Sequence, residues 1–300
     1  MQRTLRLLRR LCSAAVLAGL VLFLPDGVDD DADGPSVRFL ISLGRGTLVI
    51  CGGGEISDDV LHEFIDAAGG EEARVVVVTT ASETADSDEI EDELEFWRSQ
   101  NLARLTVLHT RSRETANDVE FASPLADATG IWFVGGNQAW LADTYLGTVC
   151  EQMIHRVMQR GGAVGGISAG AAVMSSVMIR EGKTSPEIGR GFGLLPGTVI
   201  DQHFLARNRQ ERLFGALAAH PGLVGLGIDE RAALVVRGCR LSVVGNSDVV
   251  ACISASSGRS PKIATLRPGE QANLLALSLA ANKPHRHTVF RLASHESPGD

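Results

Sequence analysis

Residues 164–174, Val-Gly-Gly-Ile-Ser-Ala-Gly-Ala-Ala-Val-Met, carry the pattern that decides the predicted fold. Small apolar residues run into Gly-Ile-Ser-Ala-Gly at positions 166–170, and residues with good helix propensity follow. A strand, a G-x-S-x-G turn and a helix in that order predict a nucleophile elbow, because glycines let the backbone turn sharply without Cβ clashes. Ser168 would then be exposed at the tip of a strand. The alternative is a glycine-rich connection with an inert serine, since G-x-S-x-G is a short pattern.

Strand-like and helix-like segments alternate on both sides of this elbow. The predicted strands of the sheet are Thr47–Cys51, Arg74–Thr80, Leu105–His109, Ile131–Val134 and Leu223–Ile228. The predicted helices are Asp58–Ala68, Asp86–Arg98, Trp140–Arg160 and Ala206–His220. This alternation predicts an α/β fold, with a doubly wound, mostly parallel sheet that is flanked by helices on both faces. Three closely spaced segments predict antiparallel strands at one edge: Ala232–Val236, Leu241–Val244 and Val249–Ile253.

Composition limits the classes of function. With 300 residues and 44% hydrophobic content, the chain can form one large core. Its net charge of -8 gives no support for nucleic-acid binding, which usually leaves a basic footprint. The five cysteines are widely spaced and form no C-x-x-C motif, so we expect neither a zinc site nor a disulfide framework. A small molecule or a peptide is the expected partner.

The chain divides into three parts. Residues 1–34 combine four arginines, an apolar run from Leu11 to Leu24 and an acidic run, which predicts a signal or membrane-anchor segment followed by an acidic linker. A disordered or wrongly assigned N-terminus is the alternative, and the protein would then be cytoplasmic. Residues 35–280 are predicted to form a single α/β hydrolytic domain. Residues 281–300 are predicted to be a polar tail.

Ser168, His203 and Glu230 are candidates for a catalytic triad. A serine nucleophile needs a base, and the base needs a carboxylate that orients it. The order Ser, His, acid differs from the Ser, acid, His order of α/β-hydrolases, which disfavours esterase chemistry on that fold. A structural histidine and a surface carboxylate are the alternatives for the latter two residues.

Arg207, Arg209 and Arg212 follow His203 closely. Three guanidinium groups would oppose protonation of the histidine unless they bind anions, so they predict recognition of substrate carboxylates. A basic, solvated helix face is the alternative. The turns 52–55 and 135–138 follow predicted strands and reach the same edge of the sheet, which is where ligands bind in this class of fold.

Several segments together resemble the S51 family of serine peptidases, and within it the cyanophycinases. They are Gly135-Gly136-Asn137-Gln138, Gly166 to Ala172, Asp201-Gln202-His203-Phe204 with the three arginines, and Gly227-Ile228-Asp229-Glu230. The resemblance covers about residues 47–253 and implies a fold similar to class I glutamine amidotransferases, with a flavodoxin-like sheet.

The resemblance also implies a function: release of β-Asp-Arg dipeptides from cyanophycin, a polyaspartate with arginine on each β-carboxyl group. Ser168 would be the nucleophile, His203 the base and Glu230 its partner, and the backbone N–H groups of Gly136 and Ala169 would hold the oxyanion. The implied substrate pocket consists of Gln138, Asp201, Gln202, Arg207, Arg209 and Arg212. Neither a metal nor a cofactor is expected, the substrate would carry carboxylates and guanidinium groups, and the family resemblance suggests a homodimer.

Three residues depart from the family pattern. Asn137 stands where Asp is common, and Ala139 and Trp140 stand where a basic residue and a leucine are expected, so the shape of the pocket is open. An aspartyl or isoaspartyl dipeptidase of the same family is the alternative enzyme. An amidotransferase is disfavoured because its nucleophile is cysteine. A non-catalytic binding protein with the same fold is the alternative of a different class.

Overall fold

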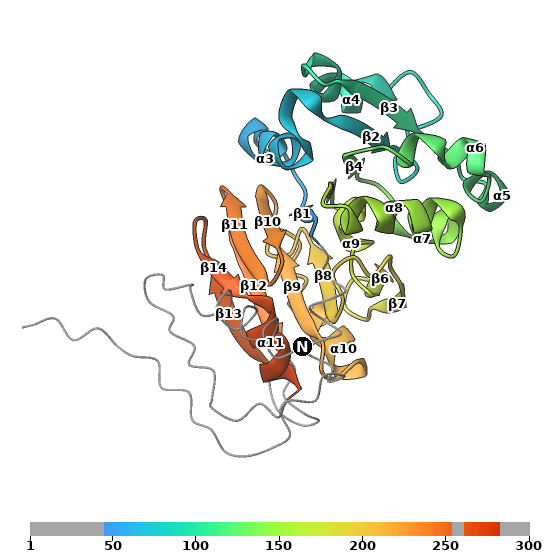
Figure 1. The fold of residues 1–300 in the computed structure, drawn as a ribbon. Coiled ribbons are helices and arrows are strands. Elements are labelled where there is room, and N and C mark those ends of the chain that lie inside the picture. Colours follow the sequence, from blue (N-terminus) through green and yellow to red (C-terminus); the bar gives the residue numbers. More distant parts are fainter. Residues whose placement is uncertain (1–44, 254–260, 283–300) are drawn as a thin grey trace, which may run out of the picture. The chain divides into compact units, whose positions relative to one another are not determined.

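The computed structural model describes residues 45–253 and 261–282, which include one large mixed sheet (Figure 1). Its eight strands lie in the order β14-β11-β10-β1-β5-β4-β2-β3. Their bounds are β1 Thr47–Cys51, β2 Arg74–Val78, β3 Arg104–Leu108, β4 Gly130–Phe133, β5 Ala163–Ile167, β10 Ala232–Arg237, β11 Arg240–Gly245 and β14 Gln271–Asn273. The five neighbouring strands β1, β5, β4, β2 and β3 pair in parallel. On the other side of β1, the strands β10, β11 and β14 add antiparallel pairs at one edge. The predicted fold class is therefore confirmed.

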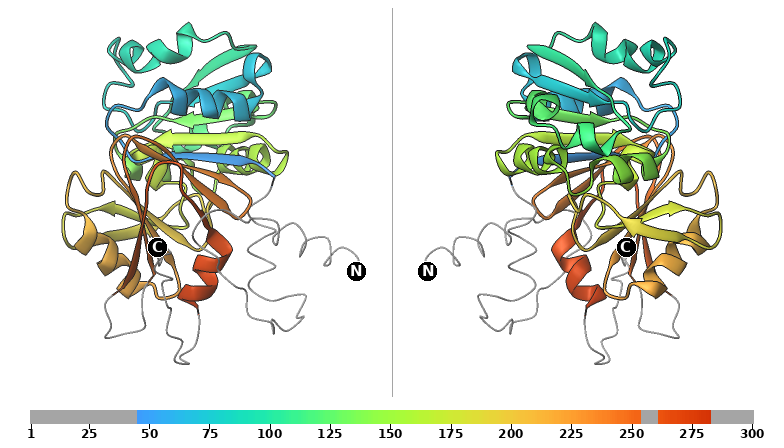
Figure 2. Two further views of the ribbon diagram at one scale, coloured as in Figure 1. Left: turned by 90° about the vertical axis from the view of Figure 1, so that its left-hand side faces the viewer. Right: turned by 90° about the vertical axis from the view of Figure 1, so that its right-hand side faces the viewer.

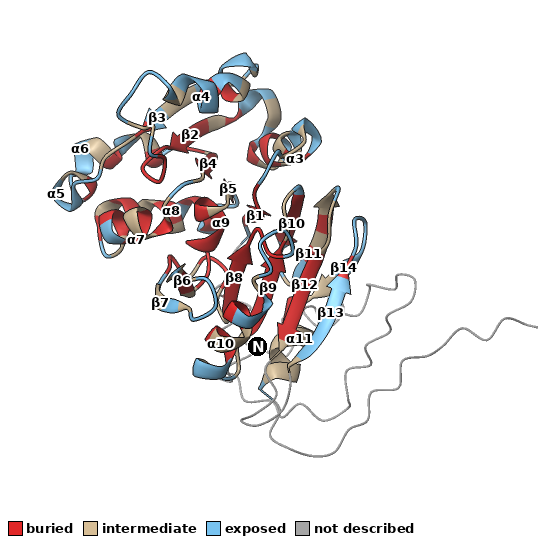
Figure 3. Cartoon of the chain, turned by 180° about the vertical axis from the view of Figure 1, so that it is seen from behind, coloured by how far each residue is buried: buried red, intermediate tan, exposed pale blue. Residues whose placement is uncertain are grey.

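Helices cover both faces of this sheet (Figure 2). One face carries α3 Asp58–Ala68 and α4 Ile90–Ser99, and the other carries α5 Arg113–Ala116, α6 Val119–Ala122, α7 Gln138–Tyr145 and α8 Val149–Gln159. Successive residues of β1 show how the two cores form. Leu48 and Ile50 pack into the core that contains Ile154, whereas Val49 packs into the core that contains Phe64. Alternate side chains of a strand point to opposite faces, so β1 is buried on both sides (Figure 3).

A second sheet of four strands was not predicted. Its order is β13-β12-β9-β8, with bounds β8 Thr198–Gln202, β9 Val224–Ile228, β12 Val249–Ile253 and β13 Lys262–Leu266. One face packs in the core that contains β10 and β11, and the other packs against α10 Gln210–Ala219. The prediction that Leu223–Ile228 and Val249–Ile253 extend the main sheet is wrong. These strands pair with each other, and β9 pairs in parallel with β8, whose last residues are polar and gave no strand signal.

The remaining elements are a hairpin, two helices and two 3-10 turns. The hairpin consists of β6 Val177–Glu181 and β7 Glu187–Arg190, the helices are α9 Ala169–Ala172 and α11 Leu274–Ala281, and two 3-10 turns span Gly70–Glu72 and Ser123–Leu125.

Three predicted helices have different bounds. The helix predicted over Trp140–Arg160 is interrupted at Gly147, which has φ 74°. The segment 206–209 lies outside α10, because Asn208 has a left-handed φ of 52° that a helix does not accommodate. The helix predicted from Asp86 begins only at Ile90.

Several predictions concern residues at the ends of the chain. The predicted signal or anchor segment at 1–34 and most of the polar tail lie outside the described residues. Within 45–253 and 261–282, no helix has both the length and the apolar character needed to cross a membrane. Export and the domain division therefore stay predictions. Cys51, Cys150 and Cys252 are buried, as expected for cysteines that act as small core residues.

Candidate active site

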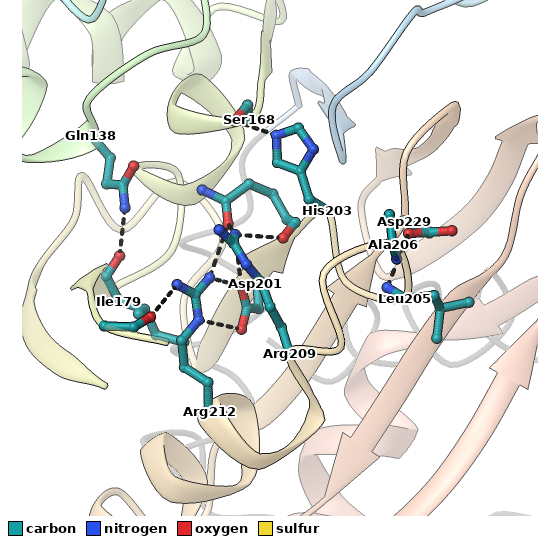
Figure 4. A network of polar contacts seen from close by, with 12 residues as sticks. Gln138, Ser168, Ile179, Asp201, His203, Leu205, Ala206, Arg209, Arg212 and Asp229 are labelled. Carbon is teal, nitrogen blue, oxygen red and sulfur yellow. Dashed lines mark hydrogen bonds and ion pairs between the residues drawn. The ribbon is translucent and has the colours of Figure 1, made fainter. Parts of the chain in front are cut away.

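The candidate site lies where strands from both sheets end. β1 and β5 of the main sheet lead into the turn Gly52–Gly54 and into Ser168, and β8 and β9 of the second sheet lead into His203 and Glu230. The His203 N–H donates to the Gly52 carbonyl at 2.8 Å, which joins the two sheets at this point. Figure 4 shows Ser168 and His203 facing each other across the junction. Residues from distant parts of the chain are thus brought to one place by strand ends.

Ser168 occupies a strained turn between β5 and α9. Its φ and ψ are 53° and -105°, a conformation that few side chains adopt. The flanking glycines are needed for space: a Cβ on Gly170 would lie 2.3 Å from the Phe133 carbonyl, and one on Gly166 would lie 2.8 Å from the backbone of Gly170. This is the geometry of a nucleophile elbow. α9 has only 4 residues, so it contributes individual N–H groups rather than the dipole of a long helix.

Ser168, His203 and Glu230 form a connected chain of hydrogen bonds. The Ser168 Oγ lies 2.9 Å from His203 Nε2, and His203 Nδ1 lies 2.6 Å from Glu230 Oε1. The carboxylate can only accept, so Nδ1 carries the proton and Nε2 is left to accept from the serine hydroxyl. These are the contacts that a nucleophile, a base and an orienting acid require.

The imidazole of His203 is held in its neutral form. Burial is the main cause that lowers its pKa, the hydrogen bond to Glu230 opposes that effect, and the positive charge of Arg207 lowers the pKa further. A neutral imidazole is the form that can take a proton from serine. The electrostatics of the site therefore favour a general base at neutral pH.

Two positions that the sequence analysis left without a role also hold the triad in place. A Cβ on Gly53 would lie 2.2 Å from Cε1 of the His203 ring, so the imidazole occupies the space that a side chain would fill. The carboxylate of Asp229 accepts the backbone N–H groups of Leu205 and Ala206, each at 2.9 Å, and so ties the segment after His203 to the strand end that carries Glu230 (Figure 4). The glycine run at 52–54 and an acid directly before Glu230 were the sequence signals available.

Asp201 and Arg212 are bound to each other rather than open to a ligand. Asp201 is 0% exposed and Arg212 is 3% exposed. The guanidinium group binds both carboxylate oxygens, with Nε at 3.0 Å from Oδ2, and its Nη1 donates to the Gly182 carbonyl at 2.8 Å (Figure 4). A buried charge is stable only when it is paired, and here each of the two residues is the other's partner. Their place in the substrate pocket stays a prediction.

Arg209 and Gln202 form the next layer of the cluster. Arg209 Nη1 donates to the backbone carbonyl of Gln202 at 2.7 Å and to its side-chain oxygen at 2.5 Å, and lies 3.6 Å from Asp201. Arg207 differs from both other arginines: it is exposed, and within the described residues its guanidinium has no carboxylate partner. The three arginines therefore differ: within the described residues Arg207 has no carboxylate partner, Arg209 is partly paired, and Arg212 is buried in an ion pair.

The 135–138 turn forms another side of the site. The Gln138 side-chain amide donates to the backbone carbonyls of Ile179 and Arg180, at 3.1 and 2.5 Å, so the side chain is fixed to β6. Asn137 caps α7 by accepting the N–H of Ala139 at 2.8 Å, a role that Asp performs equally well. Trp140 lies under the guanidinium group of Arg111, 4.4 Å from the ring centroid.

Two backbone N–H groups are available beside Ser168. In the region covered by residues 45–253, neither Gly136 nor Ala169 donates its N–H to another protein group. Gly136 has φ 123°, and a Cβ there would collide with the Ala81 carbonyl, so the turn requires glycine. A Cβ on the neighbouring Gly135 would lie 3.7 Å from that of Ser168, which places this turn next to the hydroxyl. Unpaired donors beside a nucleophile can stabilise a negative oxygen.

The chain is similar to known proteins in sequence and in fold. The family model described as Peptidase family S51 matches residues 48–244. The chain is 33% identical to the cyanophycinase of Geminocystis herdmanii over 207 residues, which are 64% of this chain and 74% of the relative. It is 32% identical to that of Synechococcus elongatus over 218 residues, 68% of this chain and 67% of the relative. Among solved structures, a peptidase from an acI-B1 Actinobacterium is 26% identical with a TM-score of 0.56, over 76% of this chain and 96% of that one. The chain belongs to peptidase family S51.

Proposed function

We propose that the chain is a serine peptidase that hydrolyses cyanophycin to β-Asp-Arg dipeptides. The observation that carries the peptidase chemistry is the hydrogen-bonded series Ser168, His203, Glu230, with Oγ to Nε2 at 2.9 Å and Nδ1 to Oε1 at 2.6 Å. The similarity to proteins named cyanophycinase supports the substrate.

The charge beside the triad supports a substrate with carboxylates. Arg207 and Arg209 bring two positive charges, and the third arginine of the cluster, Arg212, is paired with Asp201. Burial, followed by the repulsion of Arg212, lowers the pKa of Arg209 to about 10. A cation destabilised in this way gains from a bound anion. Each unit of cyanophycin offers the free carboxylate of its arginine.

The proposed reaction is acyl transfer. His203 Nε2 takes the proton of Ser168 while Oγ attacks the scissile carbonyl carbon, and the N–H groups of Gly136 and Ala169 hold the resulting oxyanion. The imidazolium, paired with Glu230, then gives its proton to the leaving amine, which leaves an acyl-enzyme. Water attacks this ester as His203 again accepts a proton, and collapse of the second intermediate returns the proton to Ser168.

The decisive experiment is mass analysis of the products released from insoluble cyanophycin. The wild-type chain is expected to release β-Asp-Arg, and the Ser168→Ala variant is expected to release none while it still sediments with the polymer. Free arginine as the first product, or equal release by Ser168→Ala, would contradict the proposal.

A dipeptidase that acts on short acidic peptides is the second candidate. The burial of Asp201 and Arg212 favours it, because only Arg207 and part of Arg209 remain for anion binding. The two functions can be distinguished by measuring kcat/KM on cyanophycin and on Asp-X dipeptides. A preference of more than about tenfold for the dipeptides would replace the first proposal with the second.

A further inference from the structure

Three strained residues of the site donate to three successive carbonyl groups. Ser168, His203 and Arg231 have φ of 53°, 50° and 62°, and Arg231 directly follows Glu230. The N–H of Ser168 donates to the Cys51 carbonyl at 3.0 Å, that of His203 to the Gly52 carbonyl at 2.8 Å, and that of Arg231 to the Gly53 carbonyl at 2.9 Å. The end of β1 and the turn after it therefore contact each of the three segments that carry the triad.

The same turn has glycines where side chains of the triad need space. A Cβ on Gly53 would lie 2.2, 2.5 and 2.7 Å from Cε1, Nε2 and Nδ1 of the His203 ring. One on Gly54 would lie 3.0 Å from Cβ of Glu230 and 3.3 Å from its Oε2. One on Gly52 would lie 2.1 Å from the Asp229 carbonyl. The turn thus combines two backbone acceptors, at Gly52 and Gly53, with contact surfaces for the imidazole and the carboxylate, and the end of β1 supplies the third acceptor at Cys51.

We infer that the turn Gly52–Gly54 is the positioning element of the catalytic site, with Gly53 as the positioning residue for the imidazole of His203. This inference rests on the proposed function. Residues held in strained conformations persist only where surrounding structure determines them, and a catalytic group must be held close to its productive geometry. The turn meets both conditions, because its carbonyls fix the strained backbones and its missing side chain leaves the slot in which the ring lies between Ser168 and Glu230.

The test compares Gly53→Ala with Gly69→Ala. Both glycines have nearly the same φ, 123° and 117°, but a Cβ on Gly69 meets nothing closer than 3.8 Å. The two variants are therefore matched in φ, and only Gly53→Ala places a methyl group in the imidazole slot. The measured quantity is the rate at which a fluorophosphonate labels Ser168, together with kcat and KM on cyanophycin.

Gly53→Ala is expected to reduce labelling and kcat by about 10²-fold with KM nearly unchanged, since a small displacement of a catalytic group costs about that much. The acid limb of its pH profile is expected to move, because the burial that lowers the pKa of His203 and the hydrogen bond to Glu230 that raises it both depend on the position of the ring. Gly69→Ala is expected to match the wild type. A wild-type labelling rate with an unmoved acid limb in Gly53→Ala, or an equal loss in Gly69→Ala, would overturn the inference.

A second pair of variants, Gly54→Ala and Gly70→Ala, tests the inference if Gly53→Ala does not fold. Gly54 and Gly70 have φ of 69° and 62°, and a Cβ on Gly70 has nothing within 4 Å. Gly54→Ala is expected to slow labelling by about tenfold through displacement of Glu230, and Gly70→Ala is expected to have no effect. Equal rates in the two variants would overturn the role of the turn.

Labelling also separates this inference from the substrate assignment. A wild-type chain that is labelled at Ser168 yet leaves cyanophycin intact would remove the proposed substrate, while the ratios of labelling rates would still decide the role of the turn. A wild-type chain that the probe does not label would remove both.

Discussion

The two sheets contribute to the site in different ways. The main sheet supplies Ser168 and unpaired N–H groups on a backbone of glycine and alanine, whereas the second sheet supplies the imidazole, the carboxylate and the arginines. On the side of the main sheet, the geometry of the site depends on backbone segments that lie close together, as at Gly166 and Gly170. On the side of the second sheet, the geometry of the site depends on which charged side chains are paired and which are free.

Charged residues that are close together in the sequence therefore differ in burial and in pairing. Arg212 is buried against Asp201, while Arg207, on the loop before α10, is exposed. Arg212 is held in an ion pair inside the protein, and Arg207 has no carboxylate partner among the described residues. Four predictions test this contrast.

Glu230→Gln should have the largest effect on the reaction. The amide cannot stabilise the imidazolium as a carboxylate does, so kcat is expected to fall by about 10²–10⁴-fold, measured by steady-state kinetics on a folded variant. Glu211→Gln, at an exposed position of α10, serves as the control and should leave kcat unchanged. If kcat of Glu230→Gln stayed close to that of the wild type, Glu230 would not be the carboxylate that orients His203.

Asp201→Ala should mainly affect stability. It leaves the guanidinium group of Arg212 buried and unpaired, which is expected to lower the free energy of unfolding by about 3–5 kcal/mol in urea denaturation. The control is Asp143→Ala, which removes the partner of Arg180 from a pair whose Asp143 side chain is 62% exposed, and should cost less than about 1 kcal/mol. Equal losses would mean that burial does not distinguish the two pairs.

At neutral pH, Arg207→Ala should mainly affect substrate binding. Loss of one exposed cation that meets the substrate is expected to raise KM by about tenfold, or about 1.4 kcal/mol, with kcat preserved. Arg240→Ala, at an exposed position of β11, should leave KM unchanged. A kcat that falls with KM unchanged would place Arg207 in the chemistry instead.

The pH dependence should give the smallest but most specific effect. His203 acts in its neutral form, so kcat/KM should fall as the pH drops through its pKa, which burial and Arg207 hold below its usual range and Glu230 partly restores. The acid limb of the wild type is therefore expected below about pH 6.5. In Arg207→Ala it should move upward, because a neighbouring positive charge is removed. An unmoved limb in a pH titration would contradict that coupling.

Local patterns in the sequence predicted much of the main sheet. The run of valines in β2 and the β-branched run in β1 indicated buried strands, and the predicted bounds of β1 and α3 agree with the structure. The second sheet could not be predicted in this way. β8 ends in Asp201 and Gln202, whose polar side chains conceal a strand, and its pairing with β9 joins segments that are distant in the chain.

The elbow could be predicted from the sequence alone, since glycines, a serine and helix-forming residues act over a few positions and need no distant partner. The residue types of the triad could be predicted in the same way. Three features depend on the three-dimensional fold instead: His203 and Glu230 reach Ser168 from another sheet, Gly53 leaves space for the imidazole, and Arg212 is buried while Arg207 is not. The physical reason is that contact, burial and charge pairing depend on long-range packing, which a local pattern does not contain.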